Sequence, residues 1–195
     1  MQRHVTRLSA RVGAGLLAVA ALVAAPTGQA SAGPPASGCS SYTTPFAPTT
    51  AAFGGVGRGY HVVGVGMASN GALGTPPLST AGKSMVGWYT PLRVRAGSAR
   101  GTVVLDAHSW PDGSALGNHL VDGLHVGATV TLTGSHGQRA CYVVTAASVY
   151  PARRTPFRAI FKRTGAPRVA VITCSGTRLG PGNWTTRTVW YASLA

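Results

Sequence analysis

The fold of this chain is limited most strongly by its short runs of β-branched and aromatic residues. Clusters of glycine, proline and polar turn residues separate these runs. Among its 195 residues, 27 are Gly and 13 are Pro, and clusters of these residues interrupt regular structure. About seven extended segments follow one another at this spacing, and the best helix candidate, 114–121, spans only one or two turns. The pattern predicts an all-β fold, either a closed barrel or a sandwich.

Several segments have the composition expected of strands. They are 61–66, 83–89, 101–108, 128–132, 140–145, 168–174 and 187–194. The fourth and fifth of these flank Gly134–Gly137, and we expect them to form a β-hairpin. Residues 149–161 are basic and aromatic and contain two prolines, which predicts a long ordered loop that carries a short helix.

The most informative pair of strands lies at the C-terminal end. Residues 168–174 form a continuous apolar run that ends in Cys174, as in a buried strand. Residues 175–186 are rich in residues that break regular structure, and 187–194 are again β-branched and aromatic. If the two strands are antiparallel neighbours, Cys174 and Arg187 lie side by side at one mouth of the sheet. A guanidinium beside a thiol favours the thiolate and can stabilise an oxyanion.

His108 also stands at the end of a predicted strand, 101–108. A thiol nucleophile needs a partner that transfers protons, and imidazole is the commonest such group. Cys174, His108 and Arg187 together would form a minimal site for nucleophilic catalysis. The residues alone leave structural alternatives open, namely a buried core cysteine, a histidine in a turn and a solvated arginine at a strand edge.

The first 32 residues have the three parts of an export signal. Arg3, Arg7 and Arg11 form a positive region, 13–25 an apolar region, and 30–32 an Ala-x-Ala cleavage site. The apolar run is shorter than the roughly 20 residues that span a bilayer. Cleavage is therefore favoured over an uncleaved membrane anchor, which stays open as the alternative.

Downstream of this signal peptide, composition separates two regions. Residues 33–50 are rich in Pro, Ser, Thr and Ala, which predicts a flexible linker. Residues 51–195 contain all the predicted strands and should form the folded domain. We expect the protein to be exported and to work at the extracellular face of the cytoplasmic membrane.

The chain is strongly basic, with 17 Lys and Arg against three acidic residues and a net charge of +14. Such a charge suits polyanionic surroundings, which include nucleic acid, acidic lipid head groups and an anionic cell wall. The export signal argues against nucleic acid, as does the lack of aromatic residues interleaved with the basic ones, and association with a membrane surface fits better. The three acidic residues and the six His are scattered, so we expect neither a metal site nor a cofactor.

Separate motifs of the chain resemble those of the sortases. Val171-Ile-Thr-Cys174 is similar to the Leu-x-Thr-Cys signature of that family. Residues 187–192 resemble the final sortase strand, which opens with arginine, and 102–108 resemble the strand that ends in the sortase histidine. The motifs occur in the order in which the family has them.

The N-terminal part of the domain resembles one group of sortases in particular. Residues 62–77, followed by 86–89, are similar to the corresponding part of actinobacterial class E and F enzymes. The chain departs from the common pattern at Ala107, where glycine is usual, and at Val171, where leucine is usual. These departures indicate a divergent branch.

The resemblance implies an eight-stranded β-barrel with one or two short helices and a cysteine transpeptidase activity. It also implies that a thiolate cleaves a Thr–Gly bond in an LPxTG-like sorting signal, and that an amine of a cell-wall precursor resolves the acyl-enzyme. By the matching motifs, Cys174 would be the nucleophile, His108 the proton donor to the leaving amine, and Arg187 the clamp on the oxyanion and substrate. Thr173 would support the binding pocket.

Two other functions remain as alternatives. One is a non-enzymatic basic barrel that binds cell-surface polyanions, with Cys174 as a core residue. The other is an L,D-transpeptidase-like enzyme, because Ser135-His-Gly-Gln-Arg-Ala-Cys141 is similar to the Ser-His-Gly-Cys motif of that family. The cysteine falls three residues too late for that motif, and a hairpin turn explains the segment more simply. In an exported protein, Cys39 and Cys141 form a candidate disulfide.

Overall fold

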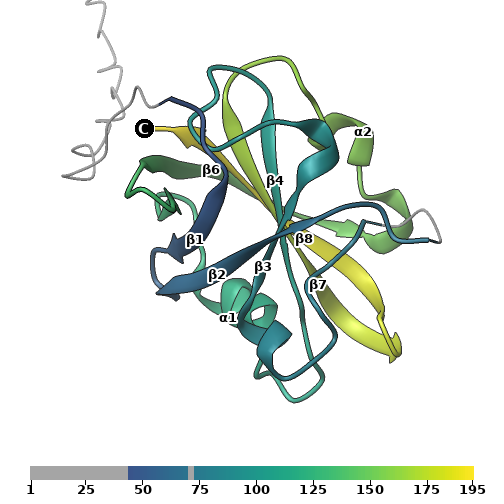
Figure 1. Ribbon diagram of the computed structural model, residues 1–195. Coiled ribbons are helices and arrows are strands. Elements are labelled where there is room, and N and C mark those ends of the chain that lie inside the picture. The colour runs from purple at the N-terminus through teal and green to yellow at the C-terminus, as the bar shows by residue number, and fades with distance from the viewer. Residues whose placement is uncertain (1–43, 70–72) are drawn as a thin grey trace, which may run out of the picture. The chain divides into compact units, whose positions relative to one another are not determined.

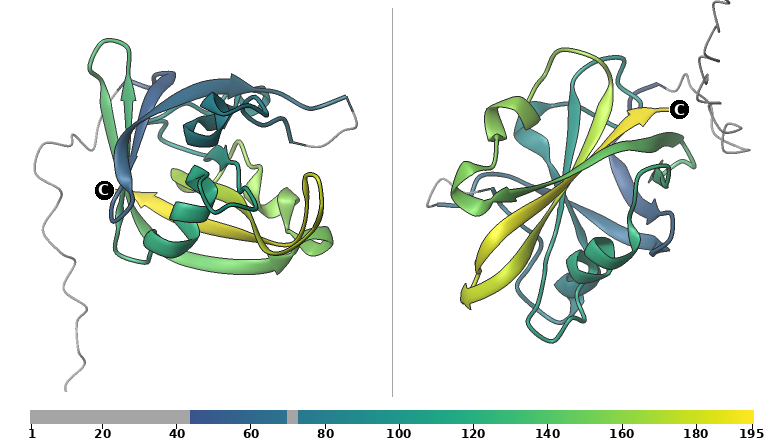
Figure 2. Two further views of the ribbon diagram at one scale, coloured as in Figure 1. Left: turned by 90° about the horizontal axis from the view of Figure 1, so that it is seen from below. Right: turned by 180° about the vertical axis from the view of Figure 1, so that it is seen from behind.

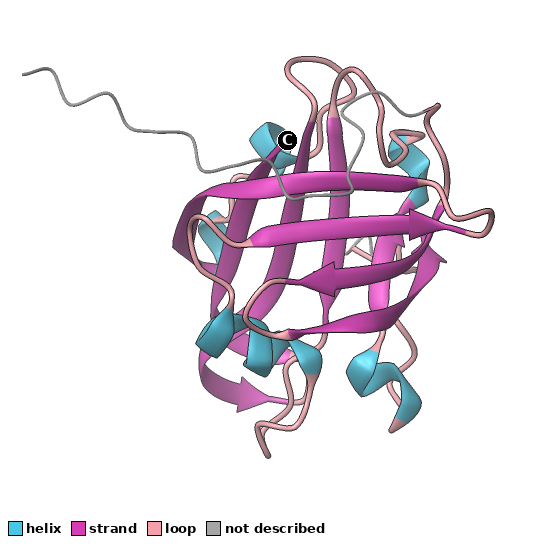
Figure 3. Ribbon diagram, turned by 90° about the vertical axis from the view of Figure 1, so that its left-hand side faces the viewer, coloured by secondary structure: helices cyan, strands magenta, loops and turns pink. Residues whose placement is uncertain are grey.

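A closed barrel of eight strands makes up the core of the protein (Figures 1 and 3). The computed structural model describes residues 44–69 and 73–195. The predicted signal peptide, most of the predicted linker and Cys39 lie outside these ranges. The predicted all-β barrel of about eight strands with short helices is confirmed.

The strands pair in an order that mixes parallel and antiparallel neighbours. In chain order they are β1 (Pro48–Phe53), β2 (Gly57–Val65), β3 (Val86–Tyr89), β4 (Thr102–Ala107), β5 (Thr129–Gly134), β6 (Arg139–Pro151), β7 (Arg168–Gly180) and β8 (Asn183–Leu194). Around the barrel the order is β1-β2-β3-β4-β7-β8-β6-β5, and β5 closes on β1. The pairs β2–β3 and β4–β7 are parallel.

Helical structure in the described residues is short and peripheral (Figure 3). The α-helices are α1 (Leu116–Gly123) and α2 (Phe157–Ile160), and the 3₁₀ turns are η1 (Ala81–Ser84), η2 (Thr90–Leu92) and η3 (Ala152–Arg154). The predicted helix at 114–121 therefore corresponds to α1, which lies two residues further on. The predicted loop at 149–161 is partly strand, because β6 continues to Pro151, and α2 is the short helix expected there.

The central strands have two buried faces with different neighbours. On β4, Val103, Leu105 and Ala107 point into the barrel and belong to its main core. Val104 points outward and packs in a second cluster with Ile172 of β7. Because strand side chains alternate, residues 104, 106 and 108 share the outward direction. Burial on both faces explains why β4 and the start of β7 read as continuous apolar runs.

The barrel begins earlier than the sequence analysis predicted. Residues 48–50, assigned to the linker, belong to β1 and pair with β5. Phe46 is also buried, and its backbone bonds to Ala96 in both directions. Pairing with β5 outweighs the Pro and Thr content of this segment, which alone indicates a linker.

The segment 175–186 is not the loop that its composition predicted. Strands β7 and β8 continue through it and form one long hairpin whose turn lies at residues 181–182. The hairpin extends beyond the rest of the barrel (Figure 2). Threonine side chains support this extension, since Thr186 Oγ1 lies 2.8 Å from Ser175 Oγ and Thr185 Oγ1 accepts from the Thr177 amide at 2.9 Å. Cys174 and Arg187 therefore lie within strands and not at their ends.

Candidate active site

The pairing of three strands brings the predicted catalytic residues into one row. Cys174 on β7 is the direct register partner of Arg187 on β8, which confirms that the two are neighbours. In the parallel pair β4–β7, Ala107 is the partner of Thr173, so His108, the next residue, continues the row beside Cys174. Strand alternation directs all three side chains to the outer face of the sheet.

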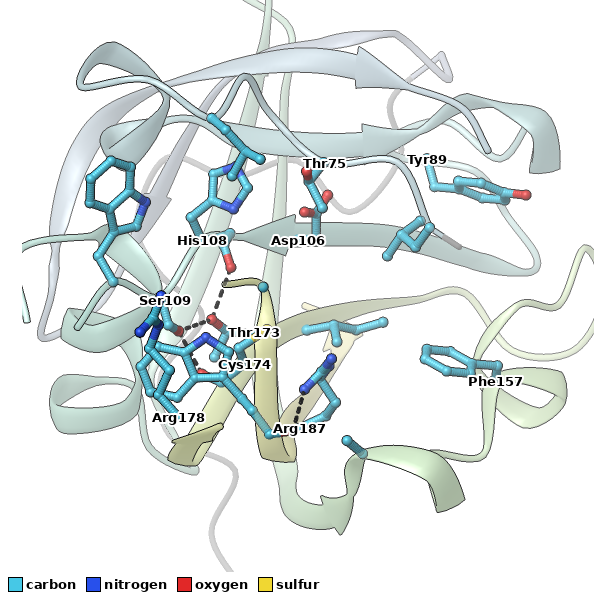
Figure 4. Close-up of a pocket in the computed structure, with 18 of the residues that line it drawn as sticks. Thr75, Tyr89, Asp106, His108, Ser109, Phe157, Thr173, Cys174, Arg178 and Arg187 are labelled. Carbon is cyan, nitrogen blue, oxygen red and sulfur yellow. Dashed lines mark hydrogen bonds between the residues drawn. The ribbon is translucent and has the colours of Figure 1, made fainter. Parts of the chain in front are cut away.

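This outer face is the floor of a cleft of about 1080 Å³ (Figure 4). His108, Cys174 and Arg187 all line it. The remaining lining is largely apolar and comes from the chain before β3, from β3 itself, from α2 and from the β7–β8 hairpin, and includes Met67, Leu73, Leu78, Tyr89, Phe157, Phe161, Ile172 and Trp184. The cleft therefore combines largely apolar walls with a thiol, an imidazole and a guanidinium on its floor.

Two opposed effects act on the thiol of Cys174. The residue is partly buried, and loss of solvation raises the pKa of the thiol above its ordinary value. The positive charge of Arg187 lowers the same pKa, while a negative charge on Asp106 would raise it. Cys174 is a free cysteine, so it is available for nucleophilic chemistry once it loses its proton.

The imidazole of His108 is held by the chain that precedes β3. Its Nε2 lies 2.7 Å from the carbonyl oxygen of Pro76, so Nε2 carries the hydrogen and donates it. Figure 4 shows the ring turned towards the side of Thr75 and away from Cys174. No hydrogen bond joins His108 to Cys174 among the described residues, and the ring has to turn about its Cα–Cβ bond to serve the thiol.

Arg187 is oriented by the backbone of its own strand. Its Nη1 donates to the carbonyl oxygen of Thr186 at 2.9 Å and more weakly to that of Trp184 at 3.4 Å. Within the part of the chain that the structure describes, its other guanidinium nitrogens make no hydrogen bond. The backbone thus fixes one edge of the planar fork, and the remaining donors are free for an anionic oxygen.

Thr173 supports the site from below rather than presenting its hydroxyl to the cleft. It is 2% exposed, and its Oγ1 donates to the carbonyl oxygen of Ala107 at 2.9 Å. Ser109 Oγ lies 2.9 Å from the same hydroxyl and also bonds the carbonyl oxygen of Cys174. These contacts tie the end of β4 to β7 beside Cys174, and the role of Thr173 in supporting the binding pocket stays a prediction.

The N-terminal end of α1 packs closely under this part of the site. The Gly117 amide donates to the carbonyl oxygen of His108 at 2.7 Å, and Asn118 Oδ1 accepts from the Trp110 amide at 2.9 Å. A side chain at position 117 would overlap Thr173 Oγ1 and lie 2.5 Å from the His108 carbonyl oxygen. Only glycine allows α1 to approach the row this closely.

We therefore expect Gly117→Ala to lower both stability and activity. Overpacking at a close contact costs about 1–3 kcal/mol, which exceeds the roughly 1 kcal/mol that alanine gains over glycine in a helix. Thermal unfolding and peptide turnover measure the two effects. Gly180→Ala is the matched control, because a Cβ there meets no atom within 4 Å. Equal unfolding temperatures for the two variants would contradict the close packing of α1.

The sequence analysis missed three charged residues that line the cleft, Asp106, Arg158 and Arg178. Asp106 stands two residues before His108 and is 5% exposed, and its Oδ1 has no hydrogen-bond partner. Arg178 lies in the extended part of the hairpin, opposite Trp184. Strand alternation could have placed Asp106 on the face of His108, whereas Arg178 fell in the segment that was read as a loop.

The remaining candidate residues lie away from this cleft. Residues 135–138 form the turn between β5 and β6, so Ser135-His-Gly is a hairpin turn as expected. Cys141 on β6 is buried and disulfide-bonded, and Cys39, its expected partner, lies outside the described residues. The described residues contain no group of three or more His, Cys, Asp or Glu that could hold a metal ion. No helix in that part of the chain is both long and apolar enough to cross a membrane.

A cleft that combines a thiol, an imidazole and a guanidinium on one sheet is suited to acyl transfer through cysteine. The family model of the sortase domain matches residues 67–195, and the chain therefore belongs to the sortase family, whose members are cysteine transpeptidases. No curated protein matches the chain.

Solved sortase structures share the fold. Sortase A of Listeria monocytogenes has a TM-score of 0.52 at 20% sequence identity, with 76% of this chain and 88% of that chain covered. Sortase C-1 of Actinomyces oris has a TM-score of 0.57 at 18% identity, with 75% of this chain and 70% of that chain covered. The barrel described above is thus the sortase barrel.

Proposed function

We propose that this protein is an exported sortase that cleaves an LPxTG-like sorting signal and transfers the acyl part to an amine of the cell envelope. The observation that supports it most directly is the register pairing of Cys174 with Arg187 beside His108, on the floor of an apolar cleft in a sortase barrel. We also propose export through the N-terminal signal and a place in a divergent branch near class E and F.

The lining of the cleft supports this choice of peptide. A leucine and a proline in the sorting signal need apolar contacts, and the walls supply them from Leu73, Leu78, Phe157 and Phe161. The threonine carbonyl then has to lie over the row of Cys174 and Arg187. A bound peptide would displace water from this row, and charge interactions there would then be stronger than in solution.

The first half of the reaction forms an acyl-enzyme. The thiolate of Cys174 attacks the threonine carbonyl carbon, and its π electrons move to the oxygen, which the free donors of Arg187 stabilise. When the oxyanion collapses, the bond to the glycine nitrogen breaks, and the imidazolium of His108 gives its proton to the leaving amine. His108 must first exchange its bond to the Pro76 carbonyl for one to this nitrogen.

The second half transfers the acyl group. The neutral imidazole now accepts a proton from the incoming amine as that amine attacks the thioester carbonyl carbon. The carbon–sulfur bond breaks, and Cys174 leaves as the thiolate. An amide bond has replaced the original amide, so the reaction needs no cofactor and no net energy input.

A covalent adduct tests the proposal. Incubation of the purified protein with LPxTG-type peptides, followed by intact-protein mass spectrometry, should show a mass gain equal to the acyl fragment. Peptide mapping should place it on Cys174. Adding a small amine should release the fragment as its amide. A folded protein that forms no adduct with any peptide of the series, while Cys174 resists alkylation, would favour the non-enzymatic alternative.

A further inference from the structure

Asp106 lies in the row of side chains next to that of the nucleophile. Its register partners are Gly87 on β3 and Ile172 on β7. Cys174 is two residues beyond Ile172 on the same face, which is about 7 Å along the strand. Both Asp106 and Cys174 line the cleft (Figure 4). A charge on this carboxyl therefore acts on the thiol across a largely apolar surface.

Among the described residues, none forms a hydrogen bond with Oδ1 of the buried Asp106. The absence of a side chain at Gly87 makes the space for Oδ1, since a Cβ there would overlap this atom. The ring of Pro76 closes the same space, with its Cδ 3.2 Å from that Cβ position. No hydrogen bond reaches Oδ1 from the described residues, and no ion pair involves Asp106 there.

Burial therefore keeps this carboxyl uncharged at neutral pH. Loss of solvation raises the pKa of Asp106 from 3.8 to about 8. Arg187 lowers the pKa of the Cys174 thiol, and a neutral Asp106 does not oppose this effect. Once Asp106 ionises, its negative charge raises the pKa of the thiol and disfavours the thiolate.

We propose that Asp106 is a positioning residue for the nucleophile, whose carboxyl must be uncharged for Cys174 to ionise readily. The residue acts through Cys174 and touches no reacting atom. Once ionised, it limits how steeply the reactivity of the thiol rises with pH. The importance of this limit for peptide transfer rests on the proposed transpeptidase function, but the limit itself is a property of the thiol and can be measured without a peptide.

Other ionisable groups face the same region and have to be held constant. His108 and Arg187 lie in the row of Cys174, Tyr89 follows Gly87 on β3, and α1 carries His119 and Asp122. Arg158 and Arg178 line the outer part of the cleft, whereas residues 73–78 carry no ionisable side chain. A variant changed only at position 106 keeps all of these groups. Their effects on the ionisation of Cys174 therefore cancel when the variant is compared with the wild type.

The test is the rate at which iodoacetamide alkylates Cys174 as a function of pH, in the wild type and in Asp106→Asn. Asparagine has nearly the same shape and cannot ionise. Below about pH 7, where Asp106 is neutral, the two rates should coincide. Above about pH 8 the variant should react up to about tenfold faster, because no carboxylate opposes its thiolate. Mass spectrometry confirms that Cys174 carries the label.

Two further variants keep the result interpretable. Asp122→Asn makes the same change at an exposed position of α1 and should follow the wild type at every pH. Asp106→Leu also removes the charge and replaces it with an apolar side chain beside Ile172, so it should reproduce the divergence if the asparagine variant does not fold.

Two outcomes would overturn the proposal. Profiles of wild type and Asp106→Asn that coincide throughout would show that the carboxyl does not act on the thiol. A faster Asp106→Asn already at pH 6–7 would show that Asp106 is charged at neutral pH. If the divergence appears but no sorting peptide forms an adduct, the transpeptidase function fails and the inference about Asp106 stands.

Discussion

Replacing Cys174 with alanine should abolish the acyl-enzyme and reduce peptide turnover by about 10⁴-fold or more, because no neighbouring group can form the covalent bond in its place. His108 and Arg187 would remain but would have no nucleophile to assist. The substitution should leave the fold intact. Cys174 is only partly buried, and the loss of one sulfur atom there costs about 1 kcal/mol or less.

The measurement combines peptide turnover, intact mass after incubation with peptide, and thermal unfolding. His108→Ala is the informative comparison, since loss of a proton donor costs typically about 10²–10⁴-fold and should still permit slow adduct formation. Full turnover by a folded Cys174→Ala protein would rule out the transpeptidase mechanism.

Part of the site follows from the sequence because the pairing of two strands that are neighbours along the chain is regular. The apolar runs at 168–174 and 187–194 identify two strands, and an antiparallel connection between them places Cys174 opposite Arg187. His108 was predicted as the last residue of a strand over 101–108, and in the structure it comes directly after β4. Alternation then assigns all three side chains to one face. Their catalytic roles stay predictions.

The extension of the β7–β8 hairpin could not be predicted from composition. Residues 175–186 contain Gly176 with a φ of 76° and a proline at 181, which taken alone indicate a loop. They form strands because each half finds its partners in the other half, as Ser175 does with Thr186. Such cross-strand pairing becomes visible only when the two segments lie side by side.

The environments of Asp106 and His108 depend on residues distant in the sequence. The space for the Asp106 carboxyl comes from Gly87, and Pro76 both covers it and accepts the hydrogen bond of His108. The presence of a glycine or a proline in a sequence does not predict such a contact. The pairing of Cys174 with Arg187 could therefore be predicted from the sequence, whereas the parallel pairing that brings His108 beside them and the groups that set their charge and orientation could not.

Arg187→Lys should reduce kcat/KM for the sorting peptide by about 10²–10³-fold, nearly as much as Arg187→Ala, because the guanidinium does two tasks that an ammonium cannot combine. Nη1 is bonded to the Thr186 carbonyl oxygen and fixes the plane of the fork, while the other donors stay free for the oxyanion. Residues 123–195 contain no Asp or Glu, so no carboxylate side chain from this part of the chain competes for them.

A second measurement separates the two effects of this residue. Lysine keeps the positive charge that lowers the pKa of the Cys174 thiol, so alkylation of Arg187→Lys near neutral pH should remain close to the wild-type rate. Arg187→Gln removes the charge, and its thiol should react several-fold more slowly at the same pH. Arg178→Lys is the control, since Arg178 lines the cleft without pairing with Cys174, and its turnover should change only a few-fold. Full activity of Arg187→Lys would show that the planar guanidinium opposite the thiol has no effect on the rate beyond that of its charge. The stabilisation of the oxyanion would then have to be assigned to other donors.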